Sequence, residues 1–230
     1  MNNQPAISKK EKARLEALGA MELLDTPPER AFDDITKLAS VICAAPVALI
    51  TLVDSDRQWF KSRVGLSATE TPRADSFCAY TMLESGLTVV EDALQDARFA
   101  QSKLVRDEPH IRFYAGAPLL TPEGYGLGSL CVIDYEPRKL TRAQTSALGV
   151  LGRTVIKLME ARRTERRLAK AKAAIKELSA LLPVCAACQQ VRRDDAYLMR
   201  VKNYLLKHPD KKSGTCLCPA CAAKAAGEFK

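Results

Sequence analysis

The sequence has no apolar run long enough to cross a membrane and no signal-peptide core. Its longest apolar stretch, residues 46–53, has the size of one strand, whereas a membrane-spanning helix needs about 18 apolar residues. Residues 1–12 are polar. We therefore expect a soluble, cytoplasmic protein without a membrane partner. Thiols stay reduced in that compartment, so paired cysteines among the 8 point to metal or redox chemistry and not to structural disulfides.

The motifs of common catalytic domains are also missing. We find no phosphate-binding loop, no kinase-like glycine boxes and no nucleophile elbow. Histidine is scarce: of the 2 histidines, His110 is expected to be structural, and His208 is a poor ligand candidate beside the cysteines near it. The sequence therefore predicts a non-enzymatic protein that acts by binding.

The 230 residues suffice for one domain of ordinary size and a small appendage. A piece of about 45 residues needs a metal, disulfides or a partner to stay folded. Basic charge is concentrated at one end, since residues 157–230 hold 17 of the 35 Lys and Arg but only 7 of the 27 Asp and Glu. A solvated basic helix and tail account for this asymmetry; the alternative is a surface for an acidic partner, nucleic acid included.

Hydrophobic periodicity predicts an α+β fold with a central antiparallel sheet flanked by helices. We expect a helix over residues 9–24 and a second one, capped by Thr26, that ends near residue 45. A short helix is expected at residues 76–83, and residues 64–75 are expected to form a loop. The strands that we expect are 47–53, 57–63, 87–90, 111–117 and 128–134.

One long helix is expected from Thr141, its N-cap candidate, to Leu182, directly before Pro183. Its apolar residues form two stripes whose register slips by one residue, a pattern typical of signalling coiled coils. The first stripe is Leu148, Leu151, Val155 and Leu158, and the second is Ala161, Thr164, Leu168, Ala171, Ile175, Leu178 and Leu182. We expect this seam to form a parallel homodimer; the alternative is packing against the preceding domain of the same chain.

A series of short blocks follows in order along residues 10–160. They are Leu23-Leu-Asp-Thr-Pro-Pro-Glu29, Phe32-Asp-Asp-Ile-Thr36, Arg57-Gln-Trp-Phe-Lys-Ser62, Glu70-Thr-Pro-Arg73, Ser76-Phe-Cys-Ala79, Ile111-Arg-Phe-Tyr-Ala-Gly-Ala-Pro118, Leu127-Gly-Ser-Leu-Cys-Val-Ile-Asp134 and Pro137-Arg138. This series resembles a common bacterial group of GAF domains. The resemblance implies an α/β sensor fold with a ligand cavity between the sheet and the overlying loops and helices. It does not identify the ligand, because such domains bind cyclic nucleotides, bilins, haem and other small molecules, and some bind nothing known.

The resemblance places the cavity over one face of the sheet, under residues 70–81. The ligand-binding candidates are Trp59, Phe77, Cys78, Asp92, Arg98, Arg112, Tyr114 and Asp134. Aromatic side chains with a few fixed polar groups suit a pocket, and an arginine inside it would favour an anionic ligand. The alternative is that Trp59 and Phe77 belong to the core and that Arg112 is one half of a structural ion pair.

Cys78 lies near the start of an expected short helix, where the helix dipole lowers the pKa of a thiol. That would suit a redox sensor or a bilin attachment point; the alternative is a buried, inert cysteine. Covalent bilin binders of this fold have His directly after the cysteine, where this chain has Ala79, and related domains often have His where this chain has Tyr80. Cys43 and Cys131 are expected to be small core residues, and they do not resemble the paired loop thiols of GAF proteins that reduce free methionine sulfoxide.

The most specific pattern lies near the C-terminus and consists of Cys185, Cys188, Cys218 and Cys221. Two C-x-x-C pairs supply the four thiolates that tetrahedral zinc requires, and we expect a structural zinc ion here. The alternatives are a disulfide, unmetallated pairs or a redox-switched zinc site. The segment resembles a cysteine module at the end of many bacterial sensor and receiver-domain proteins, in which His-Gly replaces Thr215-Cys216. Cys216 is therefore either a substitute metal ligand or a spare thiol.

The boundaries that we expect are a helix in residues 1–24, a GAF domain in 25–145, a coiled-coil helix in 146–182 and a zinc module in 183–230. The predicted function is signal sensing: the GAF pocket binds a small molecule, and a dimeric helix transmits the change to the zinc module, which meets a protein partner. The alternatives are a nucleic-acid-binding regulator that uses the basic helix and zinc module, and a thiol redox sensor.

Overall fold

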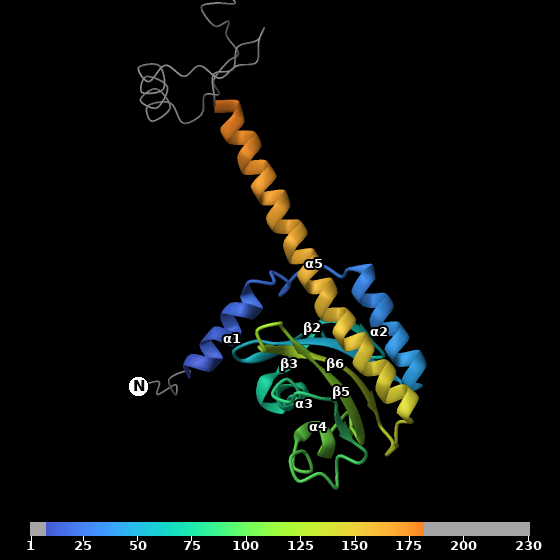
Figure 1. Ribbon diagram of the computed structural model, residues 1–230. Coiled ribbons are helices and arrows are strands. Elements are labelled where there is room, and N and C mark those ends of the chain that lie inside the picture. Colours follow the sequence, from blue (N-terminus) through green and yellow to red (C-terminus); the bar gives the residue numbers. More distant parts are fainter. Residues whose placement is uncertain (1–7, 182–230) are drawn as a thin grey trace, which may run out of the picture. The chain divides into compact units, whose positions relative to one another are not determined.

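The computed structural model describes residues 8–181, and their side chains up to residue 174. The chain divides into a compact unit that ends at Thr164 and a second unit that begins at Glu165. The first unit contains a six-stranded sheet (Figure 1), whose strands are β1 (Val47–Val53), β2 (Arg57–Val64), β3 (Glu70–Pro72), β4 (Thr88–Val90), β5 (Phe113–Leu120) and β6 (Gly126–Asp134). The strand order is β3-β2-β1-β6-β5-β4 and every pairing is antiparallel, which confirms the predicted sheet.

The middle of the sheet consists of β1, β6 and β5, which are the most apolar strands. All seven residues of β1 are buried, as its continuous apolar and β-branched sequence predicts. Ile50 of β1 lies opposite Leu130 of β6, and Val132 of β6 lies opposite Ala115 of β5. These residues share one face of the sheet, because residues that lie directly opposite each other in paired strands point to the same side.

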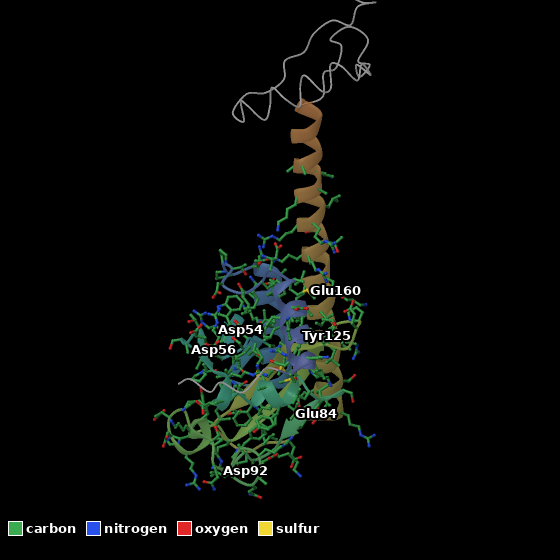
Figure 2. All side chains as sticks on the ribbon, turned by 90° about the vertical axis from the view of Figure 1, so that its left-hand side faces the viewer. Asp54, Asp56, Glu84, Asp92, Tyr125 and Glu160 are labelled. Carbon is green, nitrogen blue, oxygen red and sulfur yellow. The ribbon has the colours of Figure 1, made fainter. Side chains whose placement is uncertain are left out.

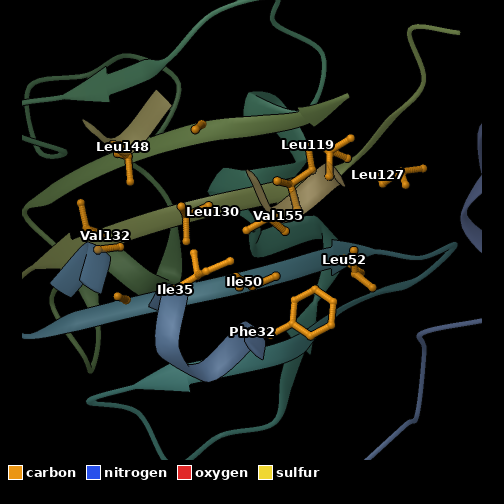
Figure 3. Close-up of a cluster of buried hydrophobic side chains, with 14 of the residues drawn as sticks. Phe32, Ile35, Ile50, Leu52, Leu119, Leu127, Leu130, Val132, Leu148 and Val155 are labelled. Carbon is orange, nitrogen blue, oxygen red and sulfur yellow. The ribbon is translucent and has the colours of Figure 1, made fainter. Parts of the chain in front are cut away.

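Helices cover both faces of the sheet. They are α1 (Lys9–Gly19), α2 (Arg30–Cys43), α3 (Phe77–Thr81), α4 (Lys103–Arg106) and α5 (Arg142–Leu181), with a short 3-10 turn, η1 (Arg73–Asp75). On one face, α2 and the first half of α5 enclose what we call the first core, which includes Phe32, Leu130 and Leu148 (Figure 3). On the other face, α3 and α4 enclose the second core, which includes Phe77 and Tyr114.

The start of α5 matches the predicted N-cap. Thr141 Oγ1 accepts a hydrogen bond from the Gln144 amide at 3.2 Å, and Gln144 Oε1 accepts one from the Thr141 amide at 2.9 Å, which forms a capping box. Farther along, a Cβ on Gly152 would lie 2.7 Å from the Cβ of Ala117. Glycine at this position therefore lets α5 lie directly on β5. None of the helices in residues 8–181 is long and apolar enough to cross a membrane.

Two helix ends near the N-terminus differ from the prediction. The first helix ends at Gly19 and does not continue to residue 24, because Glu22 and Asp25 adopt left-handed backbone conformations with φ of 51° and 58°. The apolar spacing was misleading, since Met21 and Leu23 are buried from a turn. Thr26 does not cap α2, which begins at Arg30. The residues expected to form a loop at 64–75 contain β3 and η1.

Thr26 instead belongs to a polar contact around a buried lysine. The Nζ atom of Lys61 donates to Thr26 Oγ1 at 2.9 Å, to the Pro27 carbonyl at 2.8 Å and to Glu29 Oε1 at 2.6 Å. The Lys61 side chain is only 1% exposed, so these partners offset the cost of burying its charge. Glu29 also accepts from Arg162 of α5 at 2.8 Å. This contact joins β2, the segment before α2, and α5.

A second charged contact fastens α1 to the sheet. The buried guanidinium of Arg14 donates to the Val53 carbonyl at 2.7 Å and pairs with both carboxylate oxygens of Glu11 at 2.8 Å. Glu11 also accepts from Arg73 at 2.6 Å. The hydrogen bond from Arg14, opposed by partial burial and aided by Arg73, lowers the pKa of Glu11 from 4.5 to about 2.

We predict that Glu11→Gln lowers the free energy of unfolding by about 1–2 kcal/mol near neutral pH. The folded-state pKa lies below the ordinary value, so this stabilisation is present above about pH 4.5 and is lost as the pH falls toward about 2. Urea unfolding at about pH 7 and about pH 3 measures the difference. The matched control is Glu16→Gln, at an exposed position of the same helix. An equal loss for Glu11→Gln at both pH values would contradict the prediction.

Candidate functional site

The second core contains an unusual concentration of polar and thiol groups, which we call the polar cluster. Its members come from β1, α3, β5 and β6, and are Thr51, Cys78, Thr81, Tyr114, Ser129 and Cys131. Each of them is at most 2% exposed. Buried polar groups cost free energy unless they are paired, so a cluster of this kind is expected to be closely hydrogen-bonded.

The hydroxyl of Tyr114 is the centre of the polar cluster. It lies 2.7 Å from Thr81 Oγ1 and 3.3 Å from Ser129 Oγ, and it donates to Cys78 Sγ at 3.5 Å. Thr51 Oγ1 extends the network by donating to the Ser129 carbonyl at 3.2 Å. Burial raises the pKa of Tyr114 well above its ordinary value, so the phenol stays protonated and can donate.

Gly116 explains how the Tyr114 side chain reaches this position. The two residues lie on the same face of β5, and a Cβ on Gly116 would overlap the Tyr114 hydroxyl. The phenol ring therefore lies along the strand over Gly116. On the other side its ring contacts Phe77, at a centroid distance of 5.2 Å, and Phe77 stacks on Phe99 at 4.1 Å.

Thr88 places a polar atom without a hydrogen-bond partner beside this cluster. Thr88 of β4 lies opposite Gly116, on the face that carries Tyr114. Its side chain is 6% exposed, and its Oγ1 atom has no hydrogen-bond partner in the described part of the chain. This hydroxyl therefore has unused hydrogen-bonding capacity.

Two thiols of the polar cluster are in contact. The sulfur atoms of Cys78 and Cys131 lie 3.7 Å apart. Burial raises the pKa of Cys78, but hydrogen bonds from Cys131, Ser129, Thr51 and Tyr114 outweigh burial and lower it to about 6. Hydrogen bonding to Cys78, together with burial, raises the pKa of Cys131 well above its ordinary value. Cys78 is therefore the group of this cluster that ionises first.

The predicted ligand-binding residues fall into three places. Phe77, Cys78 and Tyr114 lie together in the second core. Trp59 lies in the first core, on the opposite face of the sheet, where it stands across from Leu52. The four charged candidates form ion pairs outside the polar cluster: Asp92 with Arg112 at 2.9 Å, Arg98 with Asp96 at 2.7 Å, and Asp134 with Arg138 at 2.6 Å.

The surface carries one open depression beside a charged candidate and another over α3 that none of the candidates lines. Asp92, whose pKa the Arg112 hydrogen bonds lower, lines a groove of about 600 Å³ together with Arg138. Another depression of about 510 Å³ lies over the outer side of α3 and is lined in part by Asp56, Ala79 and Tyr80. Asp92 lies well apart from Asp56 (Figure 2), so the two depressions are separate.

Sequence reasoning missed three members of the polar cluster, Thr51, Thr81 and Ser129, and it did not predict the contact of Cys131 with Cys78. The signal for Thr51 and Ser129 was a small polar residue at an inward position of an otherwise apolar strand, which is detectable only when the face of each strand is known. Thr81 lies on α3. Within residues 8–174, no three His, Cys, Asp or Glu side chains gather as metal ligands. The predicted zinc ligands Cys185, Cys188, Cys218 and Cys221 lie outside the described residues, so the zinc site stays a prediction.

Several known proteins are similar to part of this chain. A cyclic di-GMP phosphodiesterase of Pseudomonas aeruginosa is 46% identical over 134 residues, which are 58% of this chain and 23% of that protein. The chain thus spans about a quarter of that relative. Two solved structures are similar at a TM-score of 0.49. One is the GAF domain of an Acinetobacter phosphoenolpyruvate-protein phosphotransferase, with 17% identity over 67% of this chain and 95% of that chain. The other is free methionine-R-sulfoxide reductase of Neisseria meningitidis in complex with its substrate, with 19% identity over 69% of this chain and 95% of that chain.

The family model of the GAF domain matches residues 27–157. This range takes in α2, all six strands of the sheet and the first turns of α5. Because the match covers more than half of the 230 residues, the chain belongs to the GAF domain family.

Proposed function

We propose that this GAF domain senses an uncharged small molecule at the polar cluster and transmits its presence through β5 to α5. The observation that carries the proposal is the polar cluster itself, because a fold gains nothing from six polar groups in one core that apolar side chains could fill. Binding sites combine apolar walls with a few convergent polar groups, and the stacked rings of Phe77 and Phe99 beside the Tyr114 hydroxyl match that description.

The charges of the side chains in and around the polar cluster indicate which class of ligand it would bind. Five of the six members of the polar cluster are uncharged at neutral pH, and the sixth, Cys78, has its pKa lowered to about 6, so that its thiolate would repel an anion. Arg98 and Arg112 are paired with carboxylates outside the cluster. An anionic ligand, which an arginine inside the pocket would have favoured, is therefore not supported. The free hydrogen-bonding capacity of Thr88, together with the Tyr114 hydroxyl, favours a neutral molecule with one or two polar atoms.

Transmission depends on how β5 is placed between the two cores. Tyr114 points into the second core, and Ala117, three residues later, points into the first core against Gly152 of α5. Only the Ala117 methyl group separates the strand from the helix at this contact, so a shift of β5 must be followed by α5 or leave a void. A ligand that binds the two arrangements with different affinity would shift their populations.

The second part of the proposal concerns how α5 and the cysteine module pass the signal on. Ala161, Thr164, Leu168 and Ala171 of the second apolar stripe are exposed, and Leu168 is 52% exposed. We propose that a second copy of this chain covers the stripe in a parallel dimer. The four C-terminal cysteines are proposed to bind one zinc ion per chain and to present a surface to a protein partner, which rests on their spacing. The phosphodiesterase activity named for the Pseudomonas relative is not part of the proposal, because the alignment covers 23% of that protein.

We predict that the protein purified from its host carries a neutral small molecule and that Tyr114→Phe abolishes this binding. The substitution keeps the ring but removes the hydroxyl that contacts Thr81 and Ser129. Native mass spectrometry measures the bound mass directly. The control is Tyr135→Phe, at a position 40% exposed. Equal ligand occupancy in the two variants, or none in the wild type after incubation with a host metabolite extract, would contradict the proposal.

The same native mass spectra test the proposed dimer and the proposed zinc site. We predict a dimer with one zinc ion per chain, and we expect Leu168→Glu to give monomers because it places a charge in the apolar stripe. The matched control is Ala169→Glu, which adds the same charge at the next exposed position, outside the stripe. A monomeric wild type at micromolar concentration would refute the dimer, and substantially less than one zinc per chain under reducing conditions would refute the zinc site.

A further inference from the structure

Cys78 and Cys131 form a dithiol in the second core. Nothing in their sequence spacing predicts that these two residues meet. They come from α3 and from the central strand β6, are 53 positions apart in the chain, and place their sulfur atoms 3.7 Å apart. We propose that this pair is a peroxide-sensitive redox site, in which a small hydroperoxide converts the two thiols to a disulfide. The effect of that bond on α5 rests on the transmission route proposed above, whereas its formation does not.

The geometry allows the bond with a small movement. A disulfide has sulfur atoms about 2.05 Å apart, so the two sulfurs must approach by about 1.7 Å. Cys131 is fixed, because β6 is hydrogen-bonded to β1 on one side and to β5 on the other. Cys78 lies on a helix of five residues that is attached at its ends by loops. The two sulfur atoms therefore come together by a movement of α3 and by rotation of the cysteine side chains.

The two thiols are not equivalent. Cys78 accepts a hydrogen bond from Tyr114, and the hydroxyls of Thr51 and Ser129 also lower its pKa, whereas the pKa of Cys131 is raised. A thiolate is the nucleophile toward peroxides, so Cys78 reacts first and Cys131 resolves.

The chemistry balances with the hydroperoxide as the only oxidant. The Cys78 thiolate attacks the terminal oxygen of the hydroperoxide and the O–O bond breaks. The other oxygen leaves as an alkoxide, or as hydroxide when the oxidant is hydrogen peroxide, and takes up the proton that Cys78 released on ionising, which gives an alcohol or water. Cys78 is then a sulfenic acid. Cys131 attacks the Cys78 sulfur, the S–O bond breaks, and the oxygen leaves as water with the thiol proton. Two thiols lose two electrons in total, and one hydroperoxide gains them.

Cys78 is 2% exposed, so an oxidant reaches it only when α3 opens locally. The outer side of α3 forms part of the 510 Å³ depression that Ala79 and Tyr80 line, and Tyr80 is 45% exposed. A helix of five residues contributes few hydrogen bonds, and short elements of this kind open locally at low cost. The oxidant then reaches Cys78 from the depression without unfolding of the sheet.

The test is a thiol map of the full-length protein. The reduced protein is titrated with hydrogen peroxide, alkylated in denaturant, digested and analysed by mass spectrometry. We expect a linked pair of peptides that contain Cys78 and Cys131, that has lost two hydrogen atoms and that separates again with dithiothreitol. Cys43 is the internal control, because it is buried in the first core and its pKa is raised by burial. The proposal is overturned if Cys78 and Cys131 stay free when Cys43 begins to oxidise, or if they form only sulfinic or sulfonic acids.

Variants test the order of the steps. In Cys131→Ala the resolving thiol is missing, so the sulfenic acid on Cys78 should persist and react with dimedone. Tyr114→Phe should slow the formation of the linked peptides about fivefold, because Cys78 loses one hydrogen bond to its thiolate. Thermal unfolding confirms that each variant is folded. A folded Cys131→Ala protein without a dimedone adduct overturns the assigned order. Hydrogen exchange of α5 in the linked protein tests the transmission route separately: linked thiols with unchanged α5 exchange uphold this inference and contradict that route.

Discussion

The alternation of side chains along β5 and β6 is the constraint on which the rest of the molecule depends. Consecutive residues of a strand point to opposite faces, so each of these strands contributes to both cores. Tyr114 and Cys131 face α3, and their neighbours Ala115 and Leu130 face α2 and α5. The sheet is therefore the wall between a core that contains polar groups and a core that holds the long helix. Any rearrangement at the polar cluster acts on backbone that α5 also contacts.

The buried charged contacts around the sheet determine which elements can move. Arg14 ties α1 to the sheet through the Val53 carbonyl, and Lys61 with Glu29 holds the segment before α2. Both cations are buried and hydrogen-bonded to several acceptors, so these contacts are costly to break. The cover of the second core is weaker, since α3 and α4 have five and four residues. We expect changes to begin under α3 and to be resisted at α1 and α2.

Most of the fold could be predicted from the sequence, because the central strands are nearly pure apolar runs. The strand at Val47–Val53 and the start of α5 at Thr141 lie where the pattern predicts them. The errors occur where a side chain is buried without regular structure. Met21 and Leu23 continue a helical spacing although the chain has already turned, and Thr26 donates to a carbonyl where a cap was expected. Local patterns do not contain these long-range contacts.

The site was less predictable than the fold, because it depends on which residues meet across the sheet. Trp59 was placed in the pocket by resemblance, but the alternation of β2 turns it toward Leu52 and the first core, while its neighbour Phe60 faces the second core. The charged residues predicted to bind the ligand form ion pairs with neighbouring residues instead, and no rule of sequence spacing predicts these pairs. The contact between Cys78 and Cys131 requires the three-dimensional position of α3. The zinc module lies outside the described residues, and its prediction rests on cysteine spacing alone.

Transmission through β5 is the central claim, and hydrogen exchange of α5 in the Gly116→Ala variant tests it most directly. The added methyl group displaces the Tyr114 side chain in the second core, and α5 lies on the opposite face of the sheet. The account predicts exchange about tenfold faster in the α5 turns around Gly152, with α1 unchanged, and no such effect from Gly19→Ala, where an added Cβ meets open space. Exchange that is unchanged in α5, or faster by the same factor in α1 and α5, would contradict it.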